Sequence, residues 1–292
     1  MEKLTVITPT YNRSEKLKEV FESLNKQTIN DFIWLIIDDG STDNTKETVD
    51  EFNKIKKFHI EYYYKDNGGK ASALNVALDK VKTDYCCCLD SDDTFTPTAI
   101  ETALKELETE KDNDNCCGVV ALRTSKEGIP LGNKQIPSKY QYISIGELYT
   151  ILDKTELICF YKYKFIKDIK FPTIKGEKFI SPTWFQYKAT EKRKFKVSNG
   201  QFCICEYLDD GLTKNKKSVI LKNPKGYTLV KRESLKNSKN IKKTIKHAIM
   251  YDYGSLLSKN KEFIKESPKK VATIISLPFA LIILLKNKGN QK

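Results

Sequence analysis

The sequence lacks the cysteine spacings that are typical of zinc sites and disulfide frameworks. Its eight cysteines lie in apolar runs, and no two of them form a C-x-x-C pair. Disulfide-dense domains are mostly small and secreted, whereas an unpaired cysteine behaves as a small apolar residue that is usually buried. We therefore expect eight reduced cysteines inside the protein, with no zinc and no disulfide bonds.

The sequence also lacks the succession of basic, apolar and small residues that a signal peptide shows at the N-terminus. Residues 3–8 are instead a short run rich in β-branched residues, which predicts a strand. A cytoplasmic location is the resulting expectation. The chain has no internal repeat, and no segment has the G-x-x-x-x-G-K-S/T pattern of a Walker A loop.

The positive charge is unevenly distributed along the chain, whose net charge is +13. Residues 214–292 carry 20 Lys and Arg against 4 Asp and Glu, whereas residues 1–213 carry 31 against 34. The basic excess therefore belongs to the C-terminal region and not to the body of the protein. Aromatic residues are sparse among these lysines and no nucleic-acid-binding motif is found, so nucleic acid is not an expected partner.

The first part of the chain, residues 1–125, alternates strand and helix patterns. Such alternation with right-handed crossovers predicts an α/β fold with a mostly parallel, doubly wound sheet. The following residues, 126–213, are less regular and predict a smaller lobe packed on the same sheet. A basic, helical region is expected over 214–292. The expected strands lie at residues 3–8, 32–39, 58–64, 85–90, 116–122, 156–166 and 201–208.

Acidic residues follow two of the predicted strands. Asp38 and Asp39 end the second strand, and Asp90, Asp92 and Asp93 end the fourth. Ligands of open α/β sheets bind at the carboxyl ends of the strands, and clustered like charges need a compensating cation. Carboxylate oxygens without nearby His or Cys favour Mg²⁺ or Mn²⁺ over zinc. The alternative is that these acids cap the helices that follow them.

A glycine loop and an aromatic residue accompany the acids. In "NGGKASALN", residues 67–75, two glycines precede an expected helix, so backbone N–H groups can approach an anion beside Lys70. Tyr11 follows the first strand and is placed to stack on a nucleobase, with Asp38 or Asp39 accepting from base N–H or ribose hydroxyls. The alternative for Tyr11 is a tyrosine half-buried in a turn.

Four segments in order, "VITPTYNR", "DDGSTDNT", "NGGKASALN" and "LDSDD", resemble the family 2 glycosyltransferases, which have the GT-A fold. The resemblance covers residues 3–123 and weakens toward residue 213. It implies a nucleotide-diphosphate sugar donor, with UDP favoured, and a divalent metal, Mn²⁺ or Mg²⁺. It also implies a hexosyl- or N-acetylhexosaminyl-transferase that inverts the anomeric carbon.

The resemblance assigns the nucleobase side of the site. Pro9, Thr10 and Tyr11 correspond to the segment that contacts the base, and Asp39 to the carboxylate that recognises it. Asp38 is its neighbour in the same motif.

The resemblance also assigns the diphosphate and metal side. Lys70, preceded by Gly69, corresponds to a basic position near the donor. Asp90, Ser91 and Asp92 correspond to the D-x-D motif, with Asp92 as the direct metal ligand and Asp90 nearer the ribose or the waters of the metal.

The general base is harder to assign. The family takes it from the second lobe, where Glu177 in "IKGEKFISPTWF" is our candidate and Asp210, with its neighbour Asp209, is the second choice. Relatives of this type often carry a further acid shortly after the "GEKF" stretch, where this chain has Ser181, Pro182 and Thr183. Either Glu177 is the base, or the protein is a catalytically impaired, membrane-bound nucleotide-sugar binding or scaffold protein. A nucleotidyltransferase is disfavoured because "PTYNR" replaces a Gly-rich loop after the first strand.

The most hydrophobic segment, residues 271–285, lies near the C-terminus between lysines. A spanning helix needs roughly 20 apolar residues, and Pro278 is expected to kink this one. We therefore expect a helix in the interface of an anionic membrane, with the protein peripheral on the inner face. The acceptor would be a glycan or lipid-linked glycan of bacterial cell-surface polysaccharide. The alternative is a helix docked in the core or in an oligomer interface.

Overall fold

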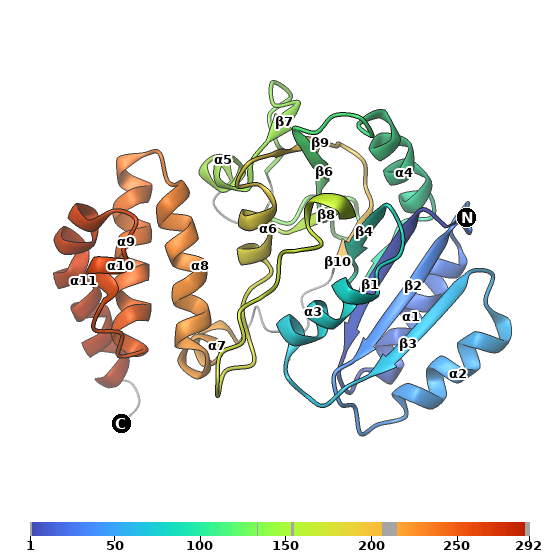
Figure 1. Ribbon diagram of the computed structural model, residues 1–292, viewed down its shortest axis with the longest axis horizontal. Helices are drawn as coiled ribbons and strands as arrows, with labels where there is room; N and C mark the ends of the chain where they lie inside the picture. The colour runs from blue at the N-terminus through green and yellow to red at the C-terminus, as the bar shows by residue number, and fades with distance from the viewer. Residues whose placement is uncertain (1, 133, 153–154, 206–214, 290–292) are drawn as a thin grey trace.

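The computed structural model describes residues 2–132, 134–152, 155–205 and 215–289. Its centre is an eight-stranded sheet with the order β3-β2-β1-β4-β8-β6-β9-β7 (Figure 1). The strands of this sheet are β1 (Leu4–Thr10), β2 (Phe32–Asp38), β3 (His59–Tyr64), β4 (Tyr85–Cys88), β6 (Cys116–Leu122), β7 (Tyr142–Ile143), β8 (Leu157–Lys162) and β9 (Lys194–Val197). A second sheet pairs β5 (Asp93–Phe95) with β10 (Cys203–Cys205) in antiparallel fashion.

Helices cover both faces of the large sheet. One apolar core lies against α3, α5 and α6, and a second lies on the opposite face against α1, α2 and α4. In β2, Leu35 belongs to the first core, whereas Trp34 and Ile36 belong to the second, because successive side chains of a strand point to opposite faces. The bounds are α1 (Ser14–Asn25), α2 (Thr45–Ile55), α3 (Lys70–Lys80), α4 (Ala99–Thr109), α5 (Ile145–Ile151), α6 (Thr183–Ala189) and the 3₁₀ helix η1 (Tyr163–Phe165).

The first four strands form the predicted parallel half of the fold. β1 pairs in parallel with β2 and β4, and β2 pairs in parallel with β3. All seven residues of β2 are buried, as expected for a strand covered on both faces. The α/β fold class is confirmed, and the carboxyl ends of these strands meet at one edge of the sheet. Six of the eight cysteines are buried, and all eight are free thiols.

The sheet becomes mixed beyond β4. The predicted strand over 156–166 forms as β8, but it inserts between β4 and β6 and runs antiparallel to both. Two antiparallel pairings restore the direction, so β6 points the same way as β4. The carboxyl end of β6, where Arg123 follows, therefore reaches the same edge as the acids of β4. β9 and β7 extend the same sheet on the far side of β6.

The C-terminal region is helical, as the sequence predicts, and lies at one end of the molecule (Figure 1). Its last helix packs on α9 through small and polar residues, since Thr273, Ser276 and Ala280 are buried. The helix runs unbroken through Pro278. The helices of this region are α7 (Lys216–Lys222), α8 (Pro224–Asn237), α9 (Ile241–Leu257), α10 (Phe263–Glu266) and α11 (Lys270–Gly289).

The contact between α9 and α11 contains a buried carboxylate, which predicts a pH effect. Asp252 is fully buried, accepts a hydrogen bond from Ser276, and has its pKa raised by burial to about 6. Its pKa in the folded protein lies above that of an unfolded Asp, so the wild type loses stability as the pH rises from about 4 to about 6. Asp252→Asn lacks this titration, and its Tm relative to wild type should rise over the same interval.

Thermal unfolding at a series of pH values measures this effect. Asp112→Asn is the matched control, because Asp112 is an exposed carboxylate beyond α4, and its Tm should follow the wild type throughout. A difference between Asp252→Asn and wild type that stays constant from acid to neutral pH would contradict the assignment.

Candidate functional site

The candidate site lies at the carboxyl edge of the sheet, where the loops after β1 and β2 are tied together. The backbone N–H of Asn12 donates to Ser41 Oγ at 2.9 Å, and that of Thr42 donates to Asn12 Oδ1 at 2.8 Å. Asn12 has a positive φ of 51°, which asparagine tolerates. This turn leaves Tyr11 49% exposed, while Pro9 and Thr10 are buried at the end of β1.

Both acids after β2 are buried and hydrogen-bonded. Asp38 accepts from the backbone N–H of Ser41 at 2.8 Å and from the hydroxyl of Tyr62 at 2.6 Å. Burial and this bond to Asp38 raise the pKa of Tyr62. Asp38 therefore fastens its own loop to β3.

Asp39 closes the glycine loop. Its Oδ1 accepts from Lys65 Nζ at 2.7 Å and from the N–H of Gly68 at 3.0 Å, and its Oδ2 accepts from the N–H of Gly69 at 2.6 Å. The structure differs here from the sequence-based expectation, because both glycine N–H groups donate to a carboxylate of the protein instead of facing a bound anion. The glycine loop is thus held against the end of β2 before any ligand arrives.

The second lobe packs directly on this loop. Lys178 Nζ donates to Asn67 Oδ1 at 2.6 Å. Gly69 has a φ of +87°, and a Cβ atom there would lie 1.8 Å from the carbonyl oxygen of Lys178. Only glycine fits at this position, both for its backbone conformation and for the available space.

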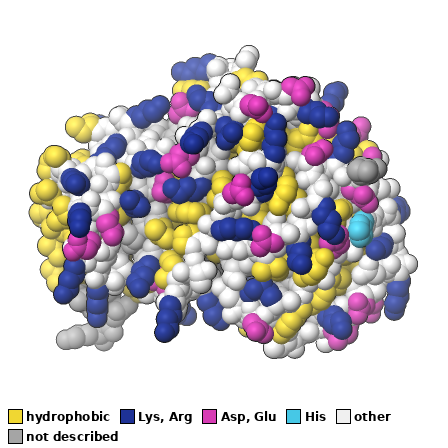
Figure 2. Space-filling model, in the orientation of Figure 1, with side chains coloured by type: hydrophobic (Ala, Val, Ile, Leu, Met, Phe, Trp, Pro, Cys, Tyr) yellow, Lys and Arg dark blue, Asp and Glu magenta, His cyan; other side chains and the backbone are white. Residues whose placement is uncertain are grey.

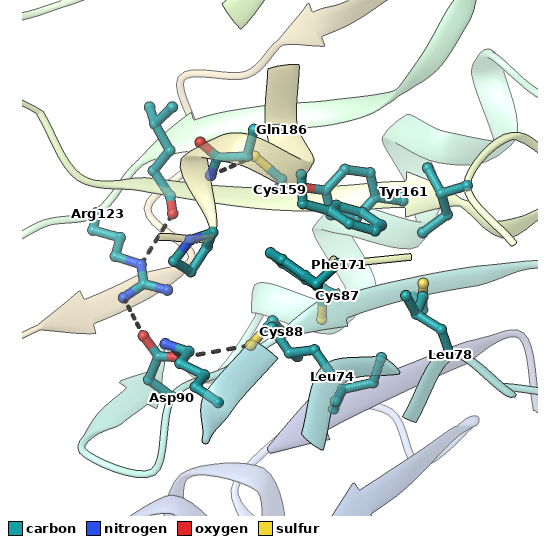
Figure 3. Close-up of a pocket in the computed structure, with 17 residues that line it drawn as sticks. Leu74, Leu78, Cys87, Cys88, Asp90, Arg123, Cys159, Tyr161, Phe171 and Gln186 are labelled. Atoms are coloured by element: carbon teal, nitrogen blue, oxygen red, sulfur yellow. Dashed lines mark hydrogen bonds and ion pairs between the residues drawn. The ribbon is translucent and has the colours of Figure 1, made fainter. Parts of the chain in front are cut away.

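A network of opposite charges surrounds Asp90 (Figure 3). Lys70 Nζ lies 2.6 Å from Asp90 Oδ1, and a guanidinium nitrogen of Arg123 lies 3.3 Å from Asp90 Oδ2. Arg123 also pairs with Asp93 and donates through Nε to the carbonyl of Leu157 at 3.1 Å. Burial alone would raise the pKa of Asp90, but the charges of Lys70 and Arg123 outweigh burial and hold it well below its usual range.

Arg123 is the functional residue that the sequence analysis missed. The available signal was its position directly after the apolar strand Cys116–Leu122, equivalent to the position of Asp90 beyond β4. Arg123 was not recognised because the local sequence pattern does not show that β6 pairs with β8. Without that pairing, the direction of β6 in the sheet, and hence the edge at which Arg123 lies, could not be predicted.

The acids after β4 form a cluster that fits a hard divalent cation. Carboxylate oxygens of Asp90, Asp92 and Asp93 all lie within 4.8 Å of one another. Burial raises the pKa of Asp93 to about 6, although Arg123 opposes the shift. Asp92 and its neighbour Ser91 are partly exposed, and no described residue donates a hydrogen bond to the carboxylate of Asp92. Converging oxygen donors of this kind suit Mg²⁺ or Mn²⁺.

The helix-cap alternative for these acids is not what the structure shows. Asp93 lies in β5 and pairs with Cys205 of β10, and the N-cap position of α4 is Thr98. The acids are therefore separated from the helix by a strand.

A cavity of about 80 Å³ opens beside Asp90 and Lys70. Its walls are mainly apolar, and Figure 3 shows Asp90 and Arg123 grouped at one end of it. Pro182 lines the cavity as well, so the segment 181–183, where the sequence resemblance predicts an acid, lies next to the charged network. The apolar lining comes from α3, β4, β8, α6 and the chain between β8 and α6, and includes Leu74, Leu78, Cys86, Cys159, Phe171 and Phe185.

Of the acids that the sequence suggested as general base, the structure describes only Glu177. The two carboxylate oxygens of Glu177 accept from the backbone N–H groups of Lys225 at 2.9 Å and Gly226 at 2.8 Å. A carboxylate at this place stabilises the N-terminus of α8. The role of Glu177 as base stays a prediction, and Asp209 and Asp210 lie outside the described residues.

The sheet order and the acids at its carboxyl edge define a GT-A type of α/β protein. A model of the glycosyl transferase family 2 matches residues 5–170, which is more than half of the chain. The protein therefore belongs to glycosyl transferase family 2, and the resemblance inferred from the four sequence segments is confirmed.

Curated relatives share the N-terminal part of the chain. "Glycosyltransferase GlyG" from Streptococcus pneumoniae is 36% identical over 121 residues, which are 40% of this chain and 38% of that relative. "Teichoic acid poly(glycerol phosphate) polymerase" from Staphylococcus epidermidis is 39% identical over 107 residues, 36% of this chain and 15% of that relative. "Putative teichuronic acid biosynthesis glycosyltransferase TuaG" from Bacillus subtilis is 33% identical over 103 residues, 35% of this chain and 40% of that relative. The matches span less than half the length of each.

Solved structures share the fold over most of the chain. S. aureus TarS 1-349 in complex with UDP has a TM-score of 0.57 and 20% identity, covering 90% of this chain and 75% of that one. The mannosyltransferase PcManGT from Pyrobaculum calidifontis, in complex with GDP-Man and Mn²⁺, has a TM-score of 0.60 and 15% identity, covering 98% of this chain and 75% of that one.

The close contact at Gly69 predicts a specific loss of stability. Gly69 and Gly176 both have a positive φ, but a Cβ at Gly176 would meet nothing within 4 Å. Gly176→Ala should cost about 1 kcal/mol of unfolding free energy through backbone strain alone. Gly69→Ala should cost about 2 kcal/mol more, because the added methyl overlaps a backbone carbonyl. Denaturant unfolding measures both values, and equal losses would contradict the described packing.

Proposed function

We propose that the protein is an inverting, metal-dependent glycosyltransferase that moves a sugar from a nucleotide-diphosphate sugar, UDP favoured, to a hydroxyl of a glycan. The observation that carries the proposal is the convergence of Lys70, Arg123 and the acids Asp90 and Asp92 at one edge of the sheet. Family membership supports the reaction class. The TarS complexes with UDP and UDP-GlcNAc and the PcManGT complex with GDP-Man and Mn²⁺ support the donor class.

The residues suit the charges of such a donor. The exposed ring of Tyr11 offers a stacking surface for a nucleobase, and Asp39, directly after β2, donates its backbone N–H to the carbonyl of the neighbouring Thr10 at 2.8 Å. Lys70 and Arg123 place two cations beside the acids, where the leaving diphosphate gains negative charge. A bound Mg²⁺ or Mn²⁺, held by Asp92 with Asp90, would add stabilisation of that charge.

Removal of Asp92 tests the metal site. Asp92→Ala should reduce nucleotide release from a panel of UDP-sugars and GDP-mannose in Mn²⁺ by more than about 100-fold, because several kcal/mol of charge stabilisation are lost. The fold should persist, since no described residue donates a hydrogen bond to this carboxylate. Asp112→Ala is the matched control, because the exposed Asp112 precedes β6 and belongs to the opposite edge of the sheet. Turnover of Asp92→Ala at the wild-type rate would contradict the assignment.

A second candidate function is favoured by one observation. Pro182 stands beside the charged network where relatives carry an acid, and Glu177 is hydrogen-bonded to α8. A scaffold that binds nucleotide sugars without turnover would have this arrangement. Calorimetry with UDP and Mn²⁺ beside a nucleotide-release assay separates the two functions, because the scaffold binds without releasing nucleotide.

The acceptor is proposed to be a glycan or lipid-linked glycan of bacterial cell-surface polysaccharide. Relatives named for teichoic and teichuronic acid synthesis support this class. The C-terminal helix supports a site of action at the inner face of the cell membrane, with the protein peripheral and its tail on anionic lipid.

The outer face of α11 is apolar and exposed, whereas an ordinary surface helix buries its apolar face and exposes its polar one. By length and composition alone the helix could cross a bilayer, and it is longer than the apolar run in the sequence suggested. Its polar face is packed on α9, so a position in the membrane interface fits better. Figure 2 shows hydrophobic side chains gathered at the end of the molecule where Figure 1 places α11. The exposed apolar residues are Val271, Ile274, Ile275, Phe279, Leu281, Ile282 and Leu285.

Vesicle binding tests this surface. Combined Ile275→Ser and Phe279→Ser substitutions should weaken binding to phosphatidylglycerol vesicles at least about tenfold, because two large apolar side chains no longer enter the lipid. Both residues are more than half exposed, so the fold should be unchanged. Ile55→Ser, an equally exposed position at the end of α2, is the matched control.

Two outcomes would contradict the membrane assignment. Unchanged vesicle binding of the double variant would show that α11 is not the anchor. Loss of a concentration-dependent dimer in sedimentation, with no vesicle binding by the wild type, would assign the face to an oligomer interface instead.

A further inference from the structure

The acids around the charged network are nearly all engaged by hydrogen-bond donors. A general base must direct a free carboxylate oxygen at the hydroxyl that loses its proton. Asp38 and Asp39 hold their loops, Asp90 and Asp93 pair with cations, and Glu177 holds the start of α8. Asp92 is the proposed metal ligand. Among these residues, none therefore has a carboxylate that is left to accept the proton of the acceptor hydroxyl.

Glu156 is a further acid at the same edge of the sheet. It directly precedes β8, and because β8 is antiparallel to β4 and β6, its first residues lie at the carboxyl ends of those strands. The carbonyl of Glu156 accepts from the backbone N–H of Arg123 at 2.9 Å. The carbonyl of the next residue, Leu157, accepts from Arg123 Nε at 3.1 Å, and Leu157 lines the cavity. Two hydrogen bonds thus fix the chain at Glu156 beside Arg123.

The surroundings of the Glu156 carboxylate suit proton transfer. Glu156 is partly exposed and directly precedes Leu157, which lines the cavity, and no described residue donates a hydrogen bond to its carboxylate. Burial raises its pKa, Asp90 raises it further, and Arg123, Lys70 and Lys216 oppose the rise. A carboxylate with a raised pKa is a stronger base than an ordinary surface acid and therefore a better proton acceptor.

We propose that Glu156 is the general base of the reaction. In the displacement, the acceptor oxygen bonds to the anomeric carbon while the bond from that carbon to the diphosphate oxygen breaks. The electron pair of the broken bond leaves on the diphosphate, and the hydroxyl proton passes to the carboxylate of Glu156. This inference rests on the proposed function, and it replaces the acid that is absent at residues 181–183 with one from the start of β8.

The test compares the full-length wild type with Glu156→Gln and Glu156→Asp. Nucleotide release is measured with UDP-sugars and GDP-mannose in Mn²⁺, with water as the acceptor, and UDP affinity is measured by calorimetry. Glu156→Gln should lower kcat about 100-fold or more, as is typical for loss of a general base, with UDP affinity within about twofold of wild type. Glu156→Asp keeps a carboxylate and should recover part of the rate.

The pH profile separates a base from a positioning residue. The wild-type rate should fall at acid pH as Glu156 is protonated, and the residual rate of Glu156→Gln should fall less steeply, because only the other acids of the site, Asp93 among them, still titrate there. Glu19→Gln, an exposed acid on α1, is the matched control and should match the wild type.

Three results would overturn the inference. The first is a turnover rate of Glu156→Gln equal to that of the wild type. The second is a loss of UDP affinity in Glu156→Gln as large as its loss of rate, which would indicate that Glu156 holds Arg123 in place. A kcat loss in Glu177→Gln without one in Glu156→Gln would return the role to Glu177. A wild type that binds UDP but releases nucleotide from no donor would instead overturn the proposed function itself, and the two failures are therefore distinct.

Discussion

The pairing of Asp90 with Lys70 and Arg123 is the interaction on which the rest of the site depends. It joins the start of α3, the end of β4 and the end of β6 in one place, and Arg123 extends it to β8 through Leu157. All three side chains are largely buried, so loss of Asp90 would leave Lys70 without its ion-pair partner, and loss of Arg123 would leave Asp93 without one, in a place where unpaired charge is costly. The order of the strands therefore brings these charges together, and the ion pairs between them in turn stabilise that order.

The local sequence pattern predicted the parallel half of the fold and the acids at its edge. Apolar runs, helical periodicity and the position of charged residues at strand ends are readable within a few residues of each other. The insertion of β8 between β4 and β6 was not predicted, because strand pairing between distant segments leaves no local signal. Arg123 was missed for that reason. The partners of Asp39 and Glu177 were missed because both acids bind backbone N–H groups of other segments, which side-chain identity does not reveal.

The two ends of the molecule have opposite chemistry. The edge of the sheet collects ionised groups that suit a diphosphate and a cation, whereas α11 turns its polar residues to α9 and its apolar residues to solvent. A membrane-bound acceptor would explain both features in one chain, since the tail would hold the enzyme at the surface where its acceptor lies. The basic composition of the tail favours an anionic lipid surface over a neutral one.

A nucleotide and a divalent metal are expected to meet at the acids beyond β4. Anomalous diffraction from crystals grown with UDP and Mn²⁺ tests this expectation, because the anomalous signal of manganese distinguishes it from the lighter atoms of the protein and the solvent. We expect a manganese peak in contact with a carboxylate oxygen of Asp92, near Asp90, with the uracil ring against Tyr11. A manganese ion bound elsewhere, or a nucleotide that does not contact the carboxyl edge of the sheet, would contradict it.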